Sequence, residues 1–238
     1  MGIQLKLGDI VADVIKKDIK NVHLSVYPPT GAVRISAPSH MQIDTIRVFA
    51  LSKINWIRKQ QKKLRDQERE TPREYLDRES HYLWGKRYLM KVVKKNEKPS
   101  VNLKHNTITL QVRPGAQQSK MREVMDEWYR QKLKERIGTL VSEWESRLGV
   151  EVGSFVVRKM KTRWGSCTPQ SQTIYINLEL AKKPLECLEY IMVHEMLHLI
   201  EATHNTRFIA LMDNFLPKWR FYRGKLNRLP VRPELWQY

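Results

Sequence analysis

Apolar and polar residues alternate in two short stretches near the beginning of the chain, 22–26 and 33–37. Between them lies 28–31, which contains two prolines and a glycine, and these residues favour a turn. Alternation with a period of two is typical of strands with one buried face, so this region predicts a β-hairpin. Over 43–57 the apolar residues recur at helical intervals, before the charged run 58–70. An amphipathic helix is therefore expected after the hairpin.

The next segment, 68–79, is almost wholly polar and predicts a connector. Beyond it, β-branched and aromatic residues predict two further strand pairs, 82–88 with 89–93 and 101–103 with 108–112. The first half of the chain is thus expected to be rich in strands.

Helical periodicity returns in a long segment, 119–148, with Ser119 as the expected N-terminal cap and Gly149 directly after the end. Two more strands are expected at 155–164 and 173–178, joined by a turn.

The most apolar helix is predicted after Pro184, and it carries His194 and His198 with Glu195 beside the first. This stretch reads H-E-x-x-H. Positions four apart lie about 40° from one another around an α-helix, so both imidazoles can direct a nitrogen at one ion. Three fixed letters also occur by chance, but two unpaired histidines and a carboxylate in a buried helix would be costly. We therefore interpret the motif as a metal site.

His204 is the expected third ligand, because catalytic zinc sites take three protein ligands and leave one position for water. On an unbroken helix His204 would lie about 15 Å from His194 along the axis, whereas ligand nitrogens around one zinc lie about 3 to 4 Å apart. The helix is therefore predicted to end soon after His198, and Asn205 or Thr206 to cap a new helix. The alternative is that His204 is a surface residue of a loop.

Glu195 is adjacent to the ligands without having to be one. It can act as a general base and take a proton from water whose pKa the metal lowers. Zinc is the expected ion, although another divalent transition metal fits the same histidines.

The spacing of the three histidines is that of the metzincin proteases, but Glu201 stands where their turn glycine lies and no Met-turn is evident. A second resemblance is carried by Arg163-Trp164-Gly165-Ser166-Cys167, Ile174-Tyr175-Ile176-Asn177, Val193-His194-Glu195, His204 and Arg207-Phe208. Together these segments are similar to the YgjP-like metal-dependent hydrolases, a zincin group related to the SprT-type metalloproteases.

This resemblance implies a zincin fold, a zinc ion held by the three histidines, and Glu195 as the general base. The resemblance also implies that four residues lie near the rim of a substrate cleft, namely Arg163, Trp164, Gly165 and Ser166. A structural role, with Trp164 packed under the sheet and Gly165 permitting a bend, is an equally open interpretation.

The net charge of +18 is large for 238 residues and favours polyanionic partners such as nucleic acid, nucleotides or acidic polypeptides. Basic residues crowd 53–73 and 86–104, which makes nucleic acid a candidate partner of the N-terminal half. A solvated helix face and lysine-bearing strand edges are the alternative explanation. Cys167 and Cys187 are too few for a disulfide framework, which fits a cytoplasmic protein. No apolar stretch is long enough to predict a membrane segment.

Together these patterns predict an α+β, zincin-like metallohydrolase with a β-rich N-terminal extension and a helical C-terminal half. The expected division is a region 1–115 with one amphipathic helix and a catalytic domain 116–238, unless the two form one continuous domain.

The expected function is zinc-dependent hydrolysis of a polypeptide. The alternatives are hydrolysis of a phosphoanhydride, as in a nucleoside triphosphate, and a non-catalytic module associated with nucleic acid. Retention of Glu195 counts against a non-catalytic role, because structural zinc needs ligands but no base.

Overall fold

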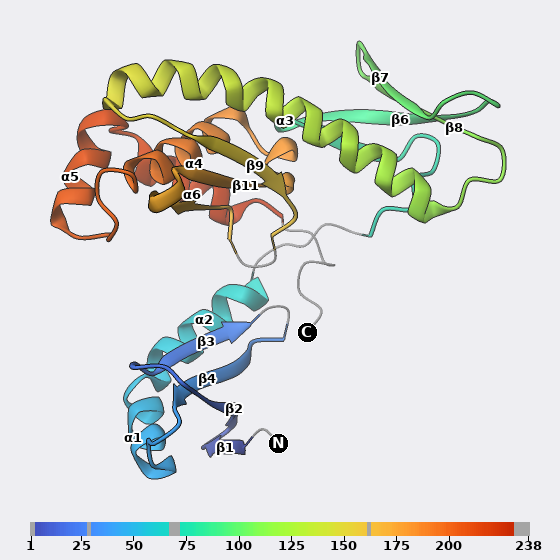
Figure 1. Cartoon of the computed structure of the whole chain (residues 1–238). Helices are drawn as coiled ribbons and strands as arrows, with labels where there is room; N and C mark the ends of the chain where they lie inside the picture. The colour runs from blue at the N-terminus through green and yellow to red at the C-terminus, as the bar shows by residue number, and fades with distance from the viewer. Residues whose placement is uncertain (1–2, 28–29, 67–71, 161–162, 231–238) are drawn as a thin grey trace. The chain divides into compact units, whose positions relative to one another are not determined.

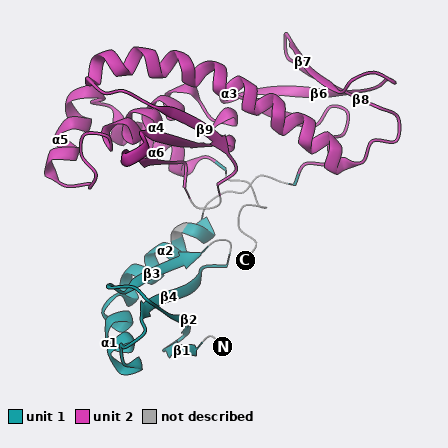
Figure 2. Cartoon of the chain, in the orientation of Figure 1, with its two compact units in different colours: residues 1–72, 230–238 teal, residues 73–229 magenta. Residues whose placement is uncertain are grey.

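The structure is a computed structural model that describes residues 3–27, 30–66, 72–160 and 163–230. It is a mixed α+β protein in which sheets dominate the N-terminal part and helices the C-terminal half, as predicted (Figure 1). The chain forms two compact units, unit 1 (1–72 with 230–238) and unit 2 (73–229) (Figure 2). Each unit has a hydrophobic core of its own.

Unit 1 is built on a four-stranded sheet. Its strands, in the spatial order β1-β2-β4-β3, are β1 (Ile3–Leu7), β2 (Ile10–Lys17), β3 (His23–Tyr27) and β4 (Ala32–Pro38). The antiparallel pair β3 and β4 confirms the predicted hairpin, although 28–29 in its turn lie outside the described residues. β1 and β2 form another hairpin, which the sequence analysis did not predict, and β2 runs parallel to β4.

Two helices follow in unit 1, α1 (Ile43–Ser52) and α2 (Ile54–Asp66). Their buried residues Ile46, Ala50 and Ile57 share one core with residues of the sheet. The amphipathic pattern of the sequence is therefore present as two helices rather than one.

Unit 2 contains a four-stranded sheet with the same connectivity as the sheet of unit 1. Its strands, in the spatial order β5-β6-β8-β7, are β5 (Ser80–Leu83), β6 (Lys86–Lys94), β7 (Ser100–Lys104) and β8 (Thr107–Val112). Two antiparallel hairpins are again joined by a central parallel pair, β6 and β8. The predicted break between residues 88 and 89 was wrong, because the first hairpin turns at Trp84 and Gly85. Both residues have positive φ, as a tight two-residue turn requires.

The longest element is α3 (Gln118–Leu148), a helix of 31 residues. It ends at Gly149 in the left-handed conformation, with φ of 66°, as predicted. Ser119 is not its cap, because the helix begins after Gln117, whose side chain makes no capping hydrogen bond.

The core of unit 2 joins α3 to the strands that precede it. Ile108 and Leu110 of β8 belong to the same buried cluster as Met125 and Leu133 of α3. Because these contacts bind the second sheet to the helical half, the compact units divide after residue 72.

A third sheet lies in unit 2, with its three strands in the spatial order β10-β11-β9. They are β9 (Ser154–Arg158), β10 (Gly165–Thr168) and β11 (Thr173–Asn177). β11 confirms the second predicted strand, whereas β9 confirms the first only as far as Arg158. β10 lies where a turn was expected, and pairing with β11 makes this short segment a strand.

A short 3-10 segment, η2 (Leu178–Lys182), connects β11 to three final helices. These are α4 (Leu185–Leu197), α5 (Thr206–Phe215) and α6 (Trp219–Arg228), of which the first two were predicted above. No helix in the described part of the chain is long and apolar enough to cross a membrane.

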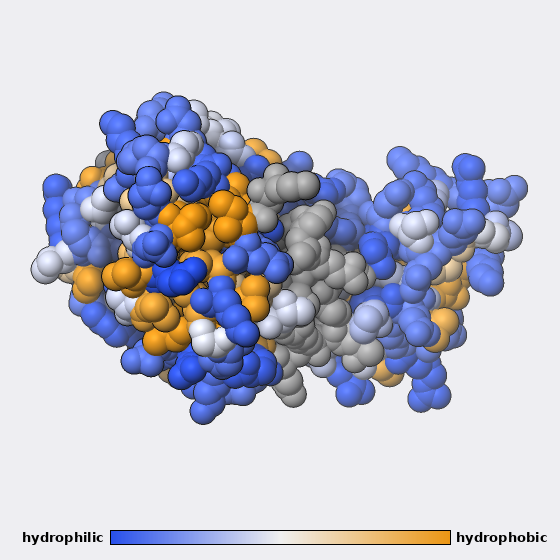
Figure 3. All heavy atoms as spheres, turned by 90° about the horizontal axis from the view of Figure 1, so that it is seen from below, coloured by the Kyte–Doolittle hydropathy of each residue, from blue (hydrophilic) through white to orange (hydrophobic). Residues whose placement is uncertain are grey.

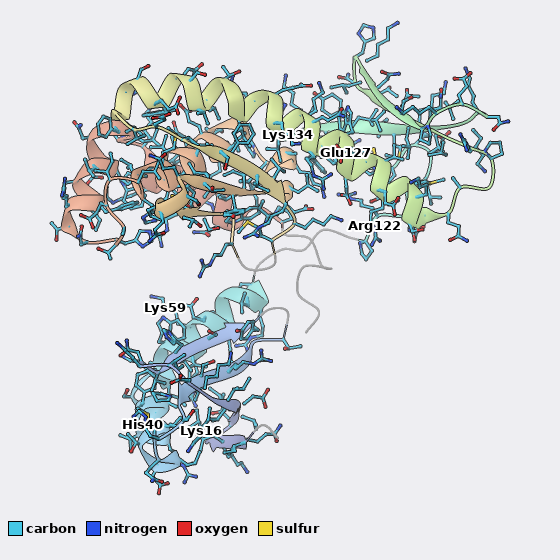
Figure 4. The ribbon with its side chains drawn as sticks, in the orientation of Figure 1. Lys16, His40, Lys59, Arg122, Glu127 and Lys134 are labelled. Carbon is cyan, nitrogen blue, oxygen red and sulfur yellow. The ribbon has the colours of Figure 1, made fainter. Side chains whose placement is uncertain are left out.

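Charged side chains are spread over both units. Lys16 and Lys59 belong to unit 1, and Arg122 and Lys134 lie on α3 of unit 2 (Figure 4). The face seen in Figure 3 is mostly hydrophilic, with hydrophobic residues confined to limited areas. The two basic stretches noted in the sequence fall in different units, so they do not form one continuous element.

The turn between β5 and β6 fixes the approach to α4. The backbone N–H of Trp84 donates to the carbonyl of Ala181 (2.8 Å), and that of Gly85 donates to the carbonyl of Lys182 (3.2 Å). Gly85 has φ of 77°, and a Cβ atom there would lie 2.9 Å from Cγ of Pro184. Both the conformation and the space therefore require glycine.

We expect Gly85→Ala to lower the free energy of unfolding by about 2 to 5 kcal/mol, because left-handed strain and overpacking add. Gly115→Ala is the matched control, since Gly115 has φ of 78° but nothing within 4 Å of an added Cβ. The control should lose about 1 to 2 kcal/mol from strain alone. Denaturant unfolding measures both changes, and equal losses would contradict the importance of the contact with Pro184.

Candidate metal centre

Two of the three histidines are positioned by the burial of α4. The apolar residues of this helix pack into the core of unit 2, and α3 lies beside it. The indole N–H of Trp144 on α3 donates to the carboxylate of Glu189 on α4 (3.2 Å). Because they are four residues apart, His194 and His198 leave the helix on one side, with ring centroids 5.0 Å apart.

The third histidine returns to the site because α4 ends early. The helix stops at Leu197, directly before His198. After a turn, Asn205 caps α5 by accepting a hydrogen bond from the backbone N–H of Phe208 (3.0 Å). The predicted helix end and the predicted cap are both confirmed, and the turn between them carries His204.

The three imidazoles form one cluster. Each ring offers a nitrogen such that the three atoms lie within 4.8 Å of one another. Nε2 of His194 and Nε2 of His204 are 2.9 Å apart. Nitrogen ligands at about 2.0 to 2.1 Å from a tetrahedral zinc lie about 3.3 Å from each other. Small adjustments of the side chains therefore suffice to fit the cluster to such an ion.

The turn between the two helices orients the imidazole of His198. Nδ1 of this ring lies 3.0 Å from the backbone carbonyl oxygen of Glu201, which leaves Nε2 available as a ligand. The carboxylate of Glu201 accepts a hydrogen bond from Oγ1 of Thr203 (3.2 Å). Glu201 thus stabilises the turn with its side chain and orients a histidine with its backbone.

Phe208 packs against all three imidazoles. Its ring centroid lies 5.0 Å from that of His194 and 4.8 Å from those of His198 and His204. The residue is buried in the core of unit 2. It therefore holds the rings as a group, a role that the sequence analysis did not assign, because helical periodicity marks Phe208 only as a core position.

His194 and His204 are in the protonation state that a metal requires. Burial, together with His198 and His204, lowers the pKa of His194 to about 3. Burial, and after it His198 and Arg223, lowers the pKa of His204. Both rings are neutral at neutral pH, and neutral imidazole is the form that coordinates metal ions.

Glu195 is enclosed beside the cluster. Its exposed fraction is only 6%. Burial raises its pKa to about 7, and the guanidinium of Arg163 acts in the opposite direction. A carboxyl group with a pKa near neutrality is suited to accept and release protons.

β10 lies directly against this glutamate. A Cβ atom on Gly165 would lie 2.7 Å from Oε1 of Glu195 and 2.9 Å from Cγ2 of Ile191. The strand can approach α4 this closely only because residue 165 has no side chain. The structure therefore brings Gly165, one of the four predicted substrate residues, into contact with the candidate base.

The other three predicted substrate residues lie next to Gly165 in the chain. Ser166 follows it in β10 and is half-buried, whereas Arg163 precedes the strand and is exposed. Trp164 is partly buried against the core of unit 2, in agreement with the structural interpretation of this residue.

Asn177, at the end of β11, fixes the segment that leads into β10. Its Nδ2 donates to the carbonyls of Met160 (2.9 Å) and Arg163 (2.8 Å), while its Oδ1 accepts from the N–H of Glu179 (3.2 Å). Asn177 is buried, so these bonds hold β10 in place without competition from water. No role of Asn177 was predicted, and the signals for one were its place in the segment Ile174-Tyr175-Ile176-Asn177 and a polar residue at the end of an apolar strand.

Comparison with known proteins agrees with this geometry. A family model described as the YgjP-like metallopeptidase domain matches residues 20–229. The chain belongs to the YgjP-like family. This match confirms the resemblance seen in the sequence and assigns the chain to a family of metal-dependent peptidases.

Among solved structures, the YgjP-like chain is similar to two metallopeptidase zymogens, abylysin of Pyrococcus abyssi and jannalysin of Methanocaldococcus jannaschii. The sequence identities are 19% and 22%, and the TM-scores are 0.36 and 0.35. Each similarity covers 38% of this chain, and 90% and 92% of the respective zymogen. No curated protein matches the chain significantly.

In the metal-free protein, we expect Glu195→Gln to raise stability at about pH 8 but not at about pH 5. The pKa of Glu195 in the folded protein is about 7, above its ordinary value of 4.5. Between these values the folded protein keeps a proton that the unfolded chain loses, so wild-type stability falls as the pH rises. The fall is at most about 3 kcal/mol, and glutamine abolishes it. Urea unfolding measures the free energy of unfolding of the wild type and of Glu195→Gln at both pH values. If the two proteins differed by the same amount at pH 5 and pH 8, the raised pKa would be contradicted.

Proposed function

We propose that this YgjP-like protein is a zinc-dependent peptidase in which the three histidines hold the ion and Glu195 is the general base. The observation that carries the proposal is the convergence of His194, His198 and His204 beside a buried carboxylate whose pKa is raised to about 7. Three imidazoles are a donor set that suits zinc and leaves a fourth position open.

Zinc bound to this cluster would supply a Lewis acid that polarises the peptide carbonyl and lowers the pKa of water. The protein's own contribution is the position of Glu195. Its Oε1 lies against the backbone of Gly165, in a site shielded from bulk solvent. From there it can take a proton from the attacking water and later return it to the amine that leaves.

A polypeptide substrate is supported by the strand next to Glu195. β10 is an edge strand of its sheet, and it contacts α4 through Gly165. Edge strands offer unpaired backbone donors and acceptors with which an extended peptide can form hydrogen bonds. A peptide bound in this way would pass its backbone beside the proposed base.

The two other functions raised by the sequence have less support. The sequence lacks a glycine-rich phosphate loop, and the basic stretches that suggested nucleic acid fall in different units. Hydrolysis of a nucleoside triphosphate and a nucleic-acid partner therefore stay predictions. A divalent transition metal other than zinc and a cytoplasmic location also stay predictions.

We expect His204→Ala to weaken zinc binding by more than about 100-fold, because it removes one of three direct ligands. Zinc content after dialysis against a graded chelator series measures the change. His23→Ala, which removes an exposed histidine of β3, is the matched control and should retain wild-type zinc. Unchanged zinc content in His204→Ala would mean that His204 is a surface residue and that another group completes the site.

We expect Glu195→Gln to keep zinc but to lower the rate of peptide hydrolysis by a factor of about 10² to 10⁴, since glutamine cannot accept the proton. Glu189→Gln on the same helix is the control, because glutamine can still accept the hydrogen bond from Trp144. Zinc content and turnover of an unfolded polypeptide are measured in parallel. Loss of zinc, or full turnover with zinc retained, would each contradict the proposed role of Glu195.

A further inference from the structure

Two contacts fix α6 against α4. Nζ of Lys225 lies 2.6 Å from Oε1 of Glu186, and the ring of Trp219 is stacked on that of Tyr190, with centroids 6.5 Å apart. Glu186 and Tyr190 are four residues apart on α4, and the next position of the same helical stripe is His194. α6 therefore runs along the side of α4 that carries the first metal ligand.

Arg223 lies on the face of α6 that meets this stripe. It is four residues after Trp219 and three before Leu226, and both of these are buried. Its own side chain is exposed. Its positive charge acts on two of the proposed ligands. Burial and the neighbouring histidines lower the pKa of His194 most, and Arg223 adds a smaller effect in the same direction. Burial and His198 lower the pKa of His204 most, and Arg223 again adds to the effect.

Arg163 reaches the same site from a different element. Its backbone carbonyl accepts a hydrogen bond from Nδ2 of Asn177 (2.8 Å). Arg163 stands two residues before Gly165, which contacts Glu195. Arg163 thus lies two residues from the strand that contacts Glu195, and Arg223 lies on the helix that packs along the side of α4 that carries His194. Among the described residues, no carboxylate forms an ion pair with either Arg163 or Arg223, whereas nearby Lys225 and Arg207 have carboxylate partners.

We propose that Arg163 and Arg223 bind carboxylates of an acidic polypeptide on the two sides of the bond to be cleaved. The proposal rests on the proposed peptidase function and specifies its substrate class. Guanidinium groups that form no ion pair favour anionic ligands, and the net charge of +18 attracts acidic chains from solution. An extended acidic peptide can pair with β10 and contact both arginines, which explains why they lie on different elements.

The test measures binding separately from catalysis. The zinc-loaded Glu195→Gln protein is titrated into a fluorescent peptide with glutamates on both sides of a central apolar residue, and into the same peptide with glutamines. We expect the acidic peptide to bind more tightly. Adding Arg223→Ala or Arg163→Ala should weaken its binding by about fivefold each, with little effect on the glutamine peptide. Arg223→Lys should lose less affinity than Arg223→Ala, because it keeps the charge.

Arg228→Ala is the matched control, since it removes one exposed arginine from the same helix, at its last residue. It should leave the affinity for the acidic peptide at the level of the parent protein. Equal affinity for the two peptides, or equal losses in Arg228→Ala and Arg223→Ala, would overturn the proposal. A nucleoside triphosphate is titrated as well, and arginine-dependent binding of the nucleotide without a preference for the acidic peptide would also overturn it.

Cleavage by the wild-type protein then separates this proposal from the peptidase function. If the glutamine peptide is cleaved as fast as the acidic one, the peptidase function stands and the substrate preference fails. If neither peptide is cleaved but the arginine-dependent binding is observed, the anion-binding role stands and the peptidase function fails. Arg223→Glu should reverse the preference, with a lysine-bearing peptide binding more tightly than the acidic one.

Discussion

The site depends on one geometric constraint, that nitrogen atoms from a helix and from the turn beyond it must meet within a few ångströms. His194 and His198 meet this condition through helical spacing alone, but His204 meets it only because α4 ends at Leu197. The hydrogen-bonded turn at Glu201 and the Asn205 cap make this end specific. Phe208 then packs the three rings against one another, so that burial of one aromatic side chain orders all of the proposed ligands.

The buried position of Glu195 lowers the stability of the metal-free protein when the carboxyl group is ionised, and the proposed chemistry explains why this residue is there. Burial favours the protonated form of this carboxyl group and outweighs the opposite effect of Arg163, which is why its pKa rises to about 7. The surrounding structure maintains this arrangement through the missing side chain of Gly165 and the hydrogen bonds of Asn177. A glutamate that destabilises the metal-free fold is what a general base in a closed site requires.

Much of the site followed from the amino-acid sequence, because its determinants are local. The spacing of His194 and His198, the need for the helix to end, and the capping residue Asn205 are all readable within a dozen positions of the chain. The long helix with its glycine terminator and the hairpins at 22–37 and 101–112 are likewise local patterns, and the structure contains them. The predicted strand boundaries were wrong where a turn contains residues that rarely form one, as at Trp84, a tryptophan with positive φ.

Contacts between distant parts of the chain decided the remaining features. β10 is a strand because it pairs with β11. It approaches Glu195, 30 positions further along the chain, so closely that a Cβ atom on Gly165 would lie 2.7 Å from Oε1 of the glutamate. Asn177 and Arg223 gain their roles from neighbours that no local pattern predicts. The division into units after residue 72 also reflects burial of β8 against α3. Periodicity in the chain identifies which residues are buried. Only the packed tertiary structure determines which of them contact one another, because the hydrophobic effect is not directional and does not select a particular partner.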